Sequence, residues 1–278
     1  MKVAVIGKNG QLASCLKEVA PKGLDIAFYG SDEVDIKSSD TFAPLASADL
    51  VINCSAYTAV DKAEEFPEDA FAVNRMGVVQ LVSFCEKHCI KLIHFSTDFV
   101  FSGEGLVPYN EEDYTNPKSV YGASKLAGEE VILQSSLSAL VIRTSWLYSS
   151  YGHNFCKTML RLGSERSELS VVADQTGTPT SALDLSRTVF EIIEEGLPKT
   201  AELLHISNTG QCTWADFARE IFRQKSLSVT VNDTSTEAFN APAKRPKYSV
   251  MSTEKLLFRY GIAMRPWKEA LSEVLKRL

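Results

Sequence analysis

The chain has 278 residues, of which 45% are hydrophobic and 23% charged, and its formal net charge is −6. These values are typical of a globular protein large enough to bury a core without disulfides or metals. The basic residues are scattered, which argues against a nucleic-acid binder. No apolar run is long enough for a signal peptide or a membrane span. We therefore expect a cytoplasmic protein that binds neither nucleic acid nor a membrane.

In chain order, the first half alternates short apolar runs with helical patterns. Strands are predicted at residues 2–6, 25–29, 50–53, 92–95 and 139–143, and helical segments at 11–20, from about 38, at 68–88 and at 119–134. Strands separated by helices indicate βαβ units and a parallel sheet covered on both faces. We predict an α/β fold with a Rossmann-type doubly wound parallel sheet.

The later part of the chain is less regular. It predicts helices at residues 154–162, 181–195, 213–224 and 267–276, with Thr213 able to cap the third, and a strand at 203–207. No linker or repeat separates the parts. We expect residues 1–145, with later returning segments, to form the first domain, and residues 146–278 to form most of a smaller C-terminal α/β lobe packed on it.

The turn after the first strand has the pattern of a dinucleotide-binding loop. Gly7 allows a tight turn, Gly10 allows the backbone to approach a pyrophosphate, and Ala13 stands where a third glycine is common. The following helix start supplies free N–H groups for phosphate. We therefore predict that the first domain binds NAD or NADP and that the lobe binds the substrate.

The second predicted strand bears on the choice between the two cofactors. A carboxylate that would repel a 2′-phosphate is missing where Gly30 or Ser31 stands, although Asp32 or Asp35 could still fill that role. The sequence thus leaves both cofactors open and favours NADPH.

A phenol and an ammonium group lie on one helical face. Tyr121 and Lys125 are four residues apart, and a nearby cation favours the phenolate, so this tyrosine can act as an acid toward a carbonyl oxygen. Two surface residues would give the same spacing. The glycine turn and Thr97, at the carboxyl end of the fourth strand, favour the catalytic interpretation because ligands bind at that edge.

Blocks along nearly the whole chain share a resemblance. They are residues 7–11, 56–64, 96–101, 121–125, 143–148, 154–159, 174–180 and 245–249. In these blocks the chain resembles the extended short-chain dehydrogenases and, more narrowly, the dTDP-4-dehydrorhamnose reductase family. The resemblance implies reduction by NAD(P)H of the C4 keto group of dTDP-4-dehydro-L-rhamnose to dTDP-L-rhamnose, with a nucleotide-sugar as partner. A homodimer is compatible with it.

The resemblance also implies roles for single residues. The catalytic set would be Thr97, Tyr121 and Lys125. Cofactor contacts would come from Gly7, Gly10, Gln11, Leu12, Asp35, Ile36, Ala56, Tyr57, Thr58, Tyr121 and Lys125. Substrate contacts would come from Thr97, Asp98 and Trp146, with Val60 and Arg245 as weaker candidates.

Magnesium is not expected. Some relatives hold it with glutamates, one of them in the first helix, where this chain has Cys15. Cys85, His88 and Cys89 share a helical face but follow an apolar segment, which favours buried thiols over a metal site. We likewise expect no catalytic role for His94 and His205, which lie in apolar strands, and packing roles for Trp214 and Trp267.

Two other functions stay open. A related nucleotide-sugar reductase, epimerase or dehydratase would use the same tyrosine and lysine, although no glutamate follows Thr97 and Asp98 as a dehydratase would favour. The resemblance extends as well to the non-catalytic regulatory subunit of methionine adenosyltransferase.

Overall fold

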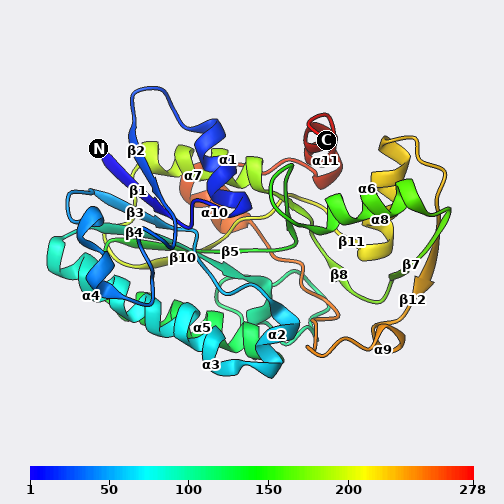
Figure 1. The fold of residues 1–278 in the computed structure, drawn as a ribbon, viewed down its shortest axis with the longest axis horizontal. Helices are drawn as coiled ribbons and strands as arrows, with labels where there is room; N and C mark the ends of the chain where they lie inside the picture. Colours follow the sequence, from blue (N-terminus) through cyan, green and yellow to red (C-terminus); the bar gives the residue numbers. More distant parts are fainter.

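The largest element is a six-stranded sheet, at the left of Figure 1. The computed structural model describes all 278 residues. The strand order is β10-β5-β4-β3-β1-β2 and all neighbours are parallel. The strands are β1 (Lys2–Ile6), β2 (Asp25–Tyr29), β3 (Leu50–Asn53), β4 (Lys91–Thr97), β5 (Ala139–Thr144) and β10 (Glu202–His205). The predicted Rossmann-type fold is confirmed, and the strand order reverses at β1, which opens a crevice there.

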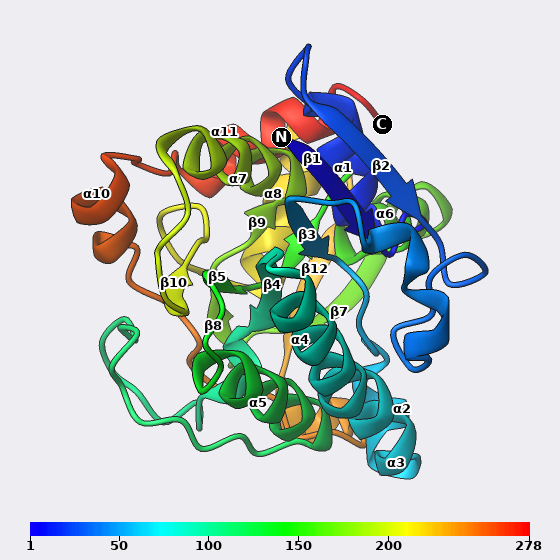
Figure 2. The same cartoon turned by 90° about the vertical axis from the view of Figure 1, so that its left-hand side faces the viewer.

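Helices cover both faces of this sheet (Figures 1 and 2). One face carries α1 (Gln11–Val19), α7 (Ala182–Glu195) and α10 (Glu254–Tyr260), with α11 (Trp267–Leu275) beyond them. The other face carries α2 (Val60–Glu65), α3 (Pro67–Phe71), α4 (Gly77–His88) and α5 (Val120–Leu133). Because side chains alternate along a strand, Val3 and Val5 join the apolar cluster with α1 and α7, while Ala4 and Ile6 join the one with α4 and α5.

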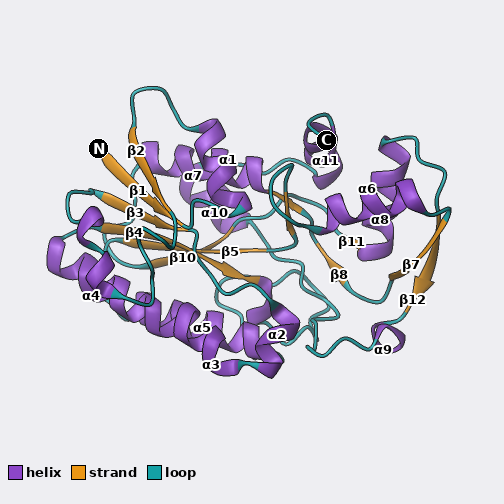
Figure 3. Ribbon diagram, viewed as in Figure 1, coloured by secondary structure: helices purple, strands orange, loops and turns teal.

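Shorter elements form the rest of the molecule, and most of them lie at the right of Figure 3. They are β6 (Leu147–Tyr148), α6 (Phe155–Glu165), β7 (Glu168–Val172), β8 (Thr176–Gly177), β9 (Thr180–Ser181), β11 (Cys212–Thr213), α8 (Trp214–Gln224), β12 (Thr230–Thr234) and α9 (Thr236–Phe239). Thr213 caps α8 in a reciprocal box with Asp216, as its position predicts. The cluster that contains Val5 continues into Leu169 and Phe217, so the two parts share one core.

Two predicted helices differ from the structure. The stretch from residue 38 forms only two single turns, η1 (Ser39–Thr41) and η2 (Ala43–Leu45), the second starting beside Pro44. The predicted helix 68–88 is divided by a π-helical turn, η3 (Ala72–Met76). Such turns often occur at functional sites, and this one contains the buried Asn74. A short turn, η4 (Asp98–Val100), follows β4.

None of the helices combines the length and the apolar character needed to cross a bilayer.

Candidate active site

A cavity of about 800 Å³ lies beyond the carboxyl ends of β3, β4 and β5, between the sheet and the smaller elements. A second cavity of about 310 Å³ adjoins it, since Asn9, Gly10, Cys54 and Ala56 line both. Predicted site residues along the larger one are Gly10, Gln11, Leu12, Ala56, Thr58, Thr97, Asp98, Tyr121, Lys125 and Trp146, together with the weaker candidates Val60 and Arg245. Gly7, Asp35 and Ile36 line the smaller one.

Tyr57 is the one predicted site residue that lines neither cavity. Its backbone N–H donates to Oδ1 of Asn74 (2.9 Å), and its carbonyl accepts from Nδ2 (3.1 Å). Asn74 thereby fixes the backbone next to Ala56 and Thr58, a role that the sequence did not indicate.

The glycine turn joins the two cavities. Gly7 has φ +89°, and a Cβ there would lie 2.8 Å from the backbone nitrogen of Ser55, so only glycine fits. Gly10 stands before α1 as its N-cap without a side chain that caps the helix. The first N–H groups of α1 therefore remain for an anion, and the turn fits a cofactor pyrophosphate.

The smaller cavity fits the adenosine end of a dinucleotide. Its wall includes Gly30, Ser31 and Lys37, none of which carries a negative charge. The first acidic residue after β2 is Asp32, whose Oδ1 lies beside Gly30, and the next, Glu33, is paired with Lys8. Asp35 accepts from the backbone N–H of Lys37 (3.0 Å). Residues 30 and 31 themselves carry no charge that would repel a 2′-phosphate.

Tyr121 and Lys125 lie one turn apart on α5, which Ser119 caps by accepting from the N–H of Gly122 (3.1 Å). Burial raises the pKa of Tyr121 to about 12, and the Thr97 hydroxyl opposes that shift. The phenol therefore stays protonated at neutral pH in this state, as an acid must before it acts.

Lys125 is 2% exposed. Its Nζ donates to the backbone oxygen of Phe95 (2.6 Å) and lies 3.2 Å from Nε2 of His94. Burial lowers its pKa to about 8, with Glu129 acting in the opposite direction. The prediction gave His94 no catalytic role, yet the structure places it against Lys125. The sequence feature that could have indicated this contact is a histidine among the apolar residues 92–95.

Asp98 is buried beside Thr97, whose hydroxyl lies 3.1 Å from Oδ1. Its Oδ2 has no hydrogen-bond partner. Burial raises the pKa of Asp98 to about 6, while the Ser249 and Thr97 hydroxyls lower it. An unpartnered carboxylate oxygen next to the cavity is suited to accept a hydrogen bond from a sugar hydroxyl.

Trp146 forms the wall opposite the sheet. It has φ +45° and stacks on Trp214 with ring centroids 3.5 Å apart. Gly177 leaves room for its indole, since a Cβ there would lie 2.5 Å away. Trp214, expected to serve packing, also lines the cavity, and Arg245 enters it while paired with Asp61 (2.7 Å).

Magnesium does not fit at the first helix. Cys15 is fully buried, and burial raises the pKa of its thiol to about 11, with Ser149 and then the cations Arg277 and Arg187 opposing. A buried neutral thiol supplies no anionic oxygen ligand of the kind that magnesium needs. No three His, Cys, Asp or Glu side chains cluster elsewhere as metal ligands would.

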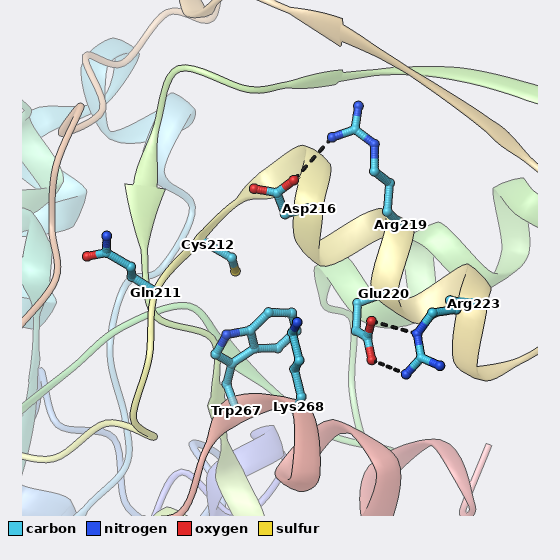
Figure 4. Close-up of a pocket in the computed structure, with 8 residues that line it drawn as sticks. All are labelled: Gln211, Cys212, Asp216, Arg219, Glu220, Arg223, Trp267 and Lys268. Carbon is cyan, nitrogen blue, oxygen red and sulfur yellow. Dashed lines mark hydrogen bonds and ion pairs between the residues drawn. The ribbon is translucent and has the colours of Figure 1, made fainter.

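A separate surface hollow of about 410 Å³ lies between α8 and α11. Figure 4 shows its acidic groups paired with arginines, Asp216 with Arg219 and Glu220 with Arg223. No predicted site residue lines it. The larger cavity therefore remains the candidate active site.

Comparison with known proteins gives one consistent match. A family model described as "RmlD substrate binding domain" covers residues 1–278. The dTDP-4-dehydrorhamnose reductase of Sinorhizobium fredii is 42% identical over 97% of this chain and 95% of its own length. The solved structure of the Bacillus anthracis dTDP-4-dehydrorhamnose reductase in complex with NADP has a TM-score of 0.95 and 37% identity, covering 100% of both chains. That of the Clostridium acetobutylicum reductase has a TM-score of 0.94 and 40% identity, covering 99% of each.

Proposed function

The chain belongs to the RmlD substrate-binding domain family, and from this premise we propose that it reduces dTDP-4-dehydro-L-rhamnose to dTDP-L-rhamnose with NAD(P)H. It is an NAD(P)-dependent oxidoreductase. The observation that carries the proposal is the cavity in which Thr97, Tyr121 and Lys125 meet the glycine turn. Relatives named as such reductases match over 95% and 98% of their own length, which supports the same reaction here.

The bound cofactor supplies the hydride that is added to the C4 keto carbon. The turn from Gly7 to Leu12 holds its pyrophosphate, and Asp35 and Ile36 lie along the adenosine. Tyr121 donates its phenolic proton to the keto oxygen, and Thr97 donates a hydrogen bond to the same oxygen. Lys125 in its ammonium form stabilises the phenolate that is left behind. Asp98 and Trp146 bind the nucleotide-sugar.

The decisive assay measures loss of reduced cofactor with enzymatically generated dTDP-4-dehydro-L-rhamnose. We expect one cofactor oxidised per substrate consumed. Tyr121→Phe should lower kcat by roughly two to four orders of magnitude because the acid is lost, with an unchanged unfolding temperature. Near-normal turnover in that folded variant would contradict the assignment of Tyr121.

The same assay separates the other candidate functions. An epimerase or dehydratase would convert its substrate without net cofactor consumption. A regulatory subunit would bind cofactor yet oxidise none of it.

We also propose a preference for NADPH, a cytoplasmic location and a homodimer. The uncharged side chains at positions 30 and 31 support the first, and six unpaired cysteines fit a reducing compartment. Light scattering of the purified protein tests the dimer.

A further inference from the structure

A row of hydrogen-bonded polar side chains from β3, the residues after it and β4 leads to Lys125. Ser55 Oγ donates to Oδ1 of Asn53 (2.6 Å), and Nδ2 of Asn53 lies 2.9 Å from Nδ1 of His94. Nε2 of His94 in turn lies 3.2 Å from Nζ of Lys125. Asn53 and His94 are 1% exposed and Lys125 is 2% exposed, so their polar atoms depend on partners within the protein, which for Lys125 include the backbone oxygen of Phe95.

The backbone fixes the orientation of the Asn53 amide. The N–H of Ser55 can only donate, and it lies 3.0 Å from Oδ1 of Asn53. Turning the amide around would place an NH₂ against that N–H. The amide therefore presents its NH₂ group to His94.

The amide in turn fixes the tautomer of His94. Because Nδ2 of Asn53 donates, Nδ1 of His94 accepts, and the proton of the neutral ring resides on Nε2. The ring is neutral, since burial lowers the pKa of His94 well below its usual value. Nε2–H therefore points at Lys125 as a donor.

An ammonium group has no lone pair to accept that proton, whereas an amine does. We propose that His94 is a positioning residue for Lys125. Its Nε2–H donates toward the lone pair of the lysine nitrogen and so favours the uncharged amine while the site is empty. The amine can still donate to the backbone oxygen of Phe95.

Other titratable or charged groups lie on α5 itself and on the elements packed against it. On α5 they are Tyr121 and Glu129, on η4 Asp98, on α2 Glu64, which accepts from the backbone N–H of Val120 at the start of α5, and on β5 Arg143. Glu129 favours the ammonium form of Lys125, but Arg143 holds its carboxylate in a bidentate pair (2.7 Å between Nη2 and Oε2). His94 is thus the neighbour that acts directly on Nζ against the charge.

The kinetic part of the inference rests on the proposed function. Turnover needs the ammonium form, because it stabilises the Tyr121 phenolate. The rate should therefore fall as pH rises through the pKa of Lys125. A change that removes the donor facing Nζ should raise that pKa and move this basic limb to higher pH.

The tautomer can be tested without any activity. The ¹⁵N–¹H spectrum of the cofactor-free protein with labelled histidine should show the His94 proton on Nε2, with the signal assigned by its loss in His94→Gln. In Asn53→Asp the carboxylate accepts from His94, so the proton should appear on Nδ1. A wild-type proton on Nδ1 would overturn the inference, whether or not the protein is a reductase.

The pH profile of kcat tests the effect on Lys125. Both Asn53→Asp and His94→Gln place an acceptor toward Nζ and should move the basic limb upward by about one pH unit or more. His205→Gln is the matched control, since His205 is another buried histidine of the sheet and lies against Arg143 instead. It should leave the limb in place. An unmoved limb in both folded test variants would refute the role of His94.

Discussion

Asp98 is a residue at which burial opposes ionisation. Its pKa is raised to about 6 by burial, above the ordinary value of 3.8, so the folded state disfavours the carboxylate. Because the unfolded chain releases this proton at lower pH than the folded protein does, the loss of stability is absent at low pH and grows as pH rises from about 4 through about 6. Asp98→Asn should therefore gain stability relative to the parent over that range. Unfolding temperatures measured at pH 4 and pH 8 test this; an equal difference at both values would contradict it.

Ser31 is the residue at which we expect the choice between NADPH and NADH to be decided. It is exposed in the wall of the smaller cavity, where a carboxylate would face the ribose. Ser31→Asp should lower kcat/KM for NADPH by about tenfold or more through repulsion of the 2′-phosphate, and affect NADH less. Ser31→Asn has the same shape without the charge and serves as control. Equal losses with both cofactors would place the 2′-position elsewhere.

Residue-scale prediction from the sequence was strongest where a motif fixes geometry. Tyr121 and Lys125 needed only helical spacing to share a face, and Gly7 needed only its place after a strand. The contacts of Tyr57 and His94 were not predicted, because they are made with Asn74 and Lys125, which come from distant segments of the chain. No local pattern encodes such contacts.

At the scale of elements, α5 is held against η3 by a close backbone approach. A Cβ at Gly128 would lie 2.2 Å from the backbone oxygen of Asn74. Gly128→Ala gains about 1 kcal/mol of helix propensity. However, the backbone of Asn74 cannot rotate away from the added methyl group as a side chain could, and such overpacking costs about 1–3 kcal/mol. We expect a net loss in the free energy of unfolding, measured in urea. Glu130→Ala, exposed on the same helix, should be nearly neutral; comparable losses in both would remove the packing argument.

The elements themselves were predictable where apolar periodicity was long. The five strands of the first half and helices α5, α7 and α8 lie within a few residues of the expected positions. The stretch after residue 38 failed because Pro44 and a short connection leave only single turns. The π-helical turn could not be foreseen, since the sequence of residues 68–88 has an uninterrupted helical pattern.

At the scale of the whole molecule, an ion network joins the C-terminal segment to α1 and α7, two of the helices on one face of the sheet. Glu273 pairs with Arg187 (2.6 Å) and Arg265 (2.5 Å), while Arg277 pairs with Glu18 on α1. The hydrogen bond from Arg187 is the largest influence that lowers the pKa of Glu273, to about 2. The stabilisation is therefore present above the ordinary pKa of 4.5 and is lost as pH falls toward 2.

Glu273→Gln should lower the free energy of unfolding by about 1 kcal/mol at neutral pH, a modest value because the network is partly exposed. The difference from the parent should shrink as pH falls through 4. Glu269→Gln changes an exposed glutamate of the same helix and is the control. A loss that does not depend on pH would show that charge pairing is not its cause.

The return of the chain to β10 matters for synthesis on the ribosome. β5 ends at Thr144, but its outer neighbour begins only at Glu202, and α7, which covers that face, lies between them. A nascent chain that has emerged only to residue 145 presents β5 as an unpaired edge beside uncovered apolar side chains, the condition that favours aggregation. The sheet gains its last strand, β10, only when most of the polypeptide has left the exit tunnel.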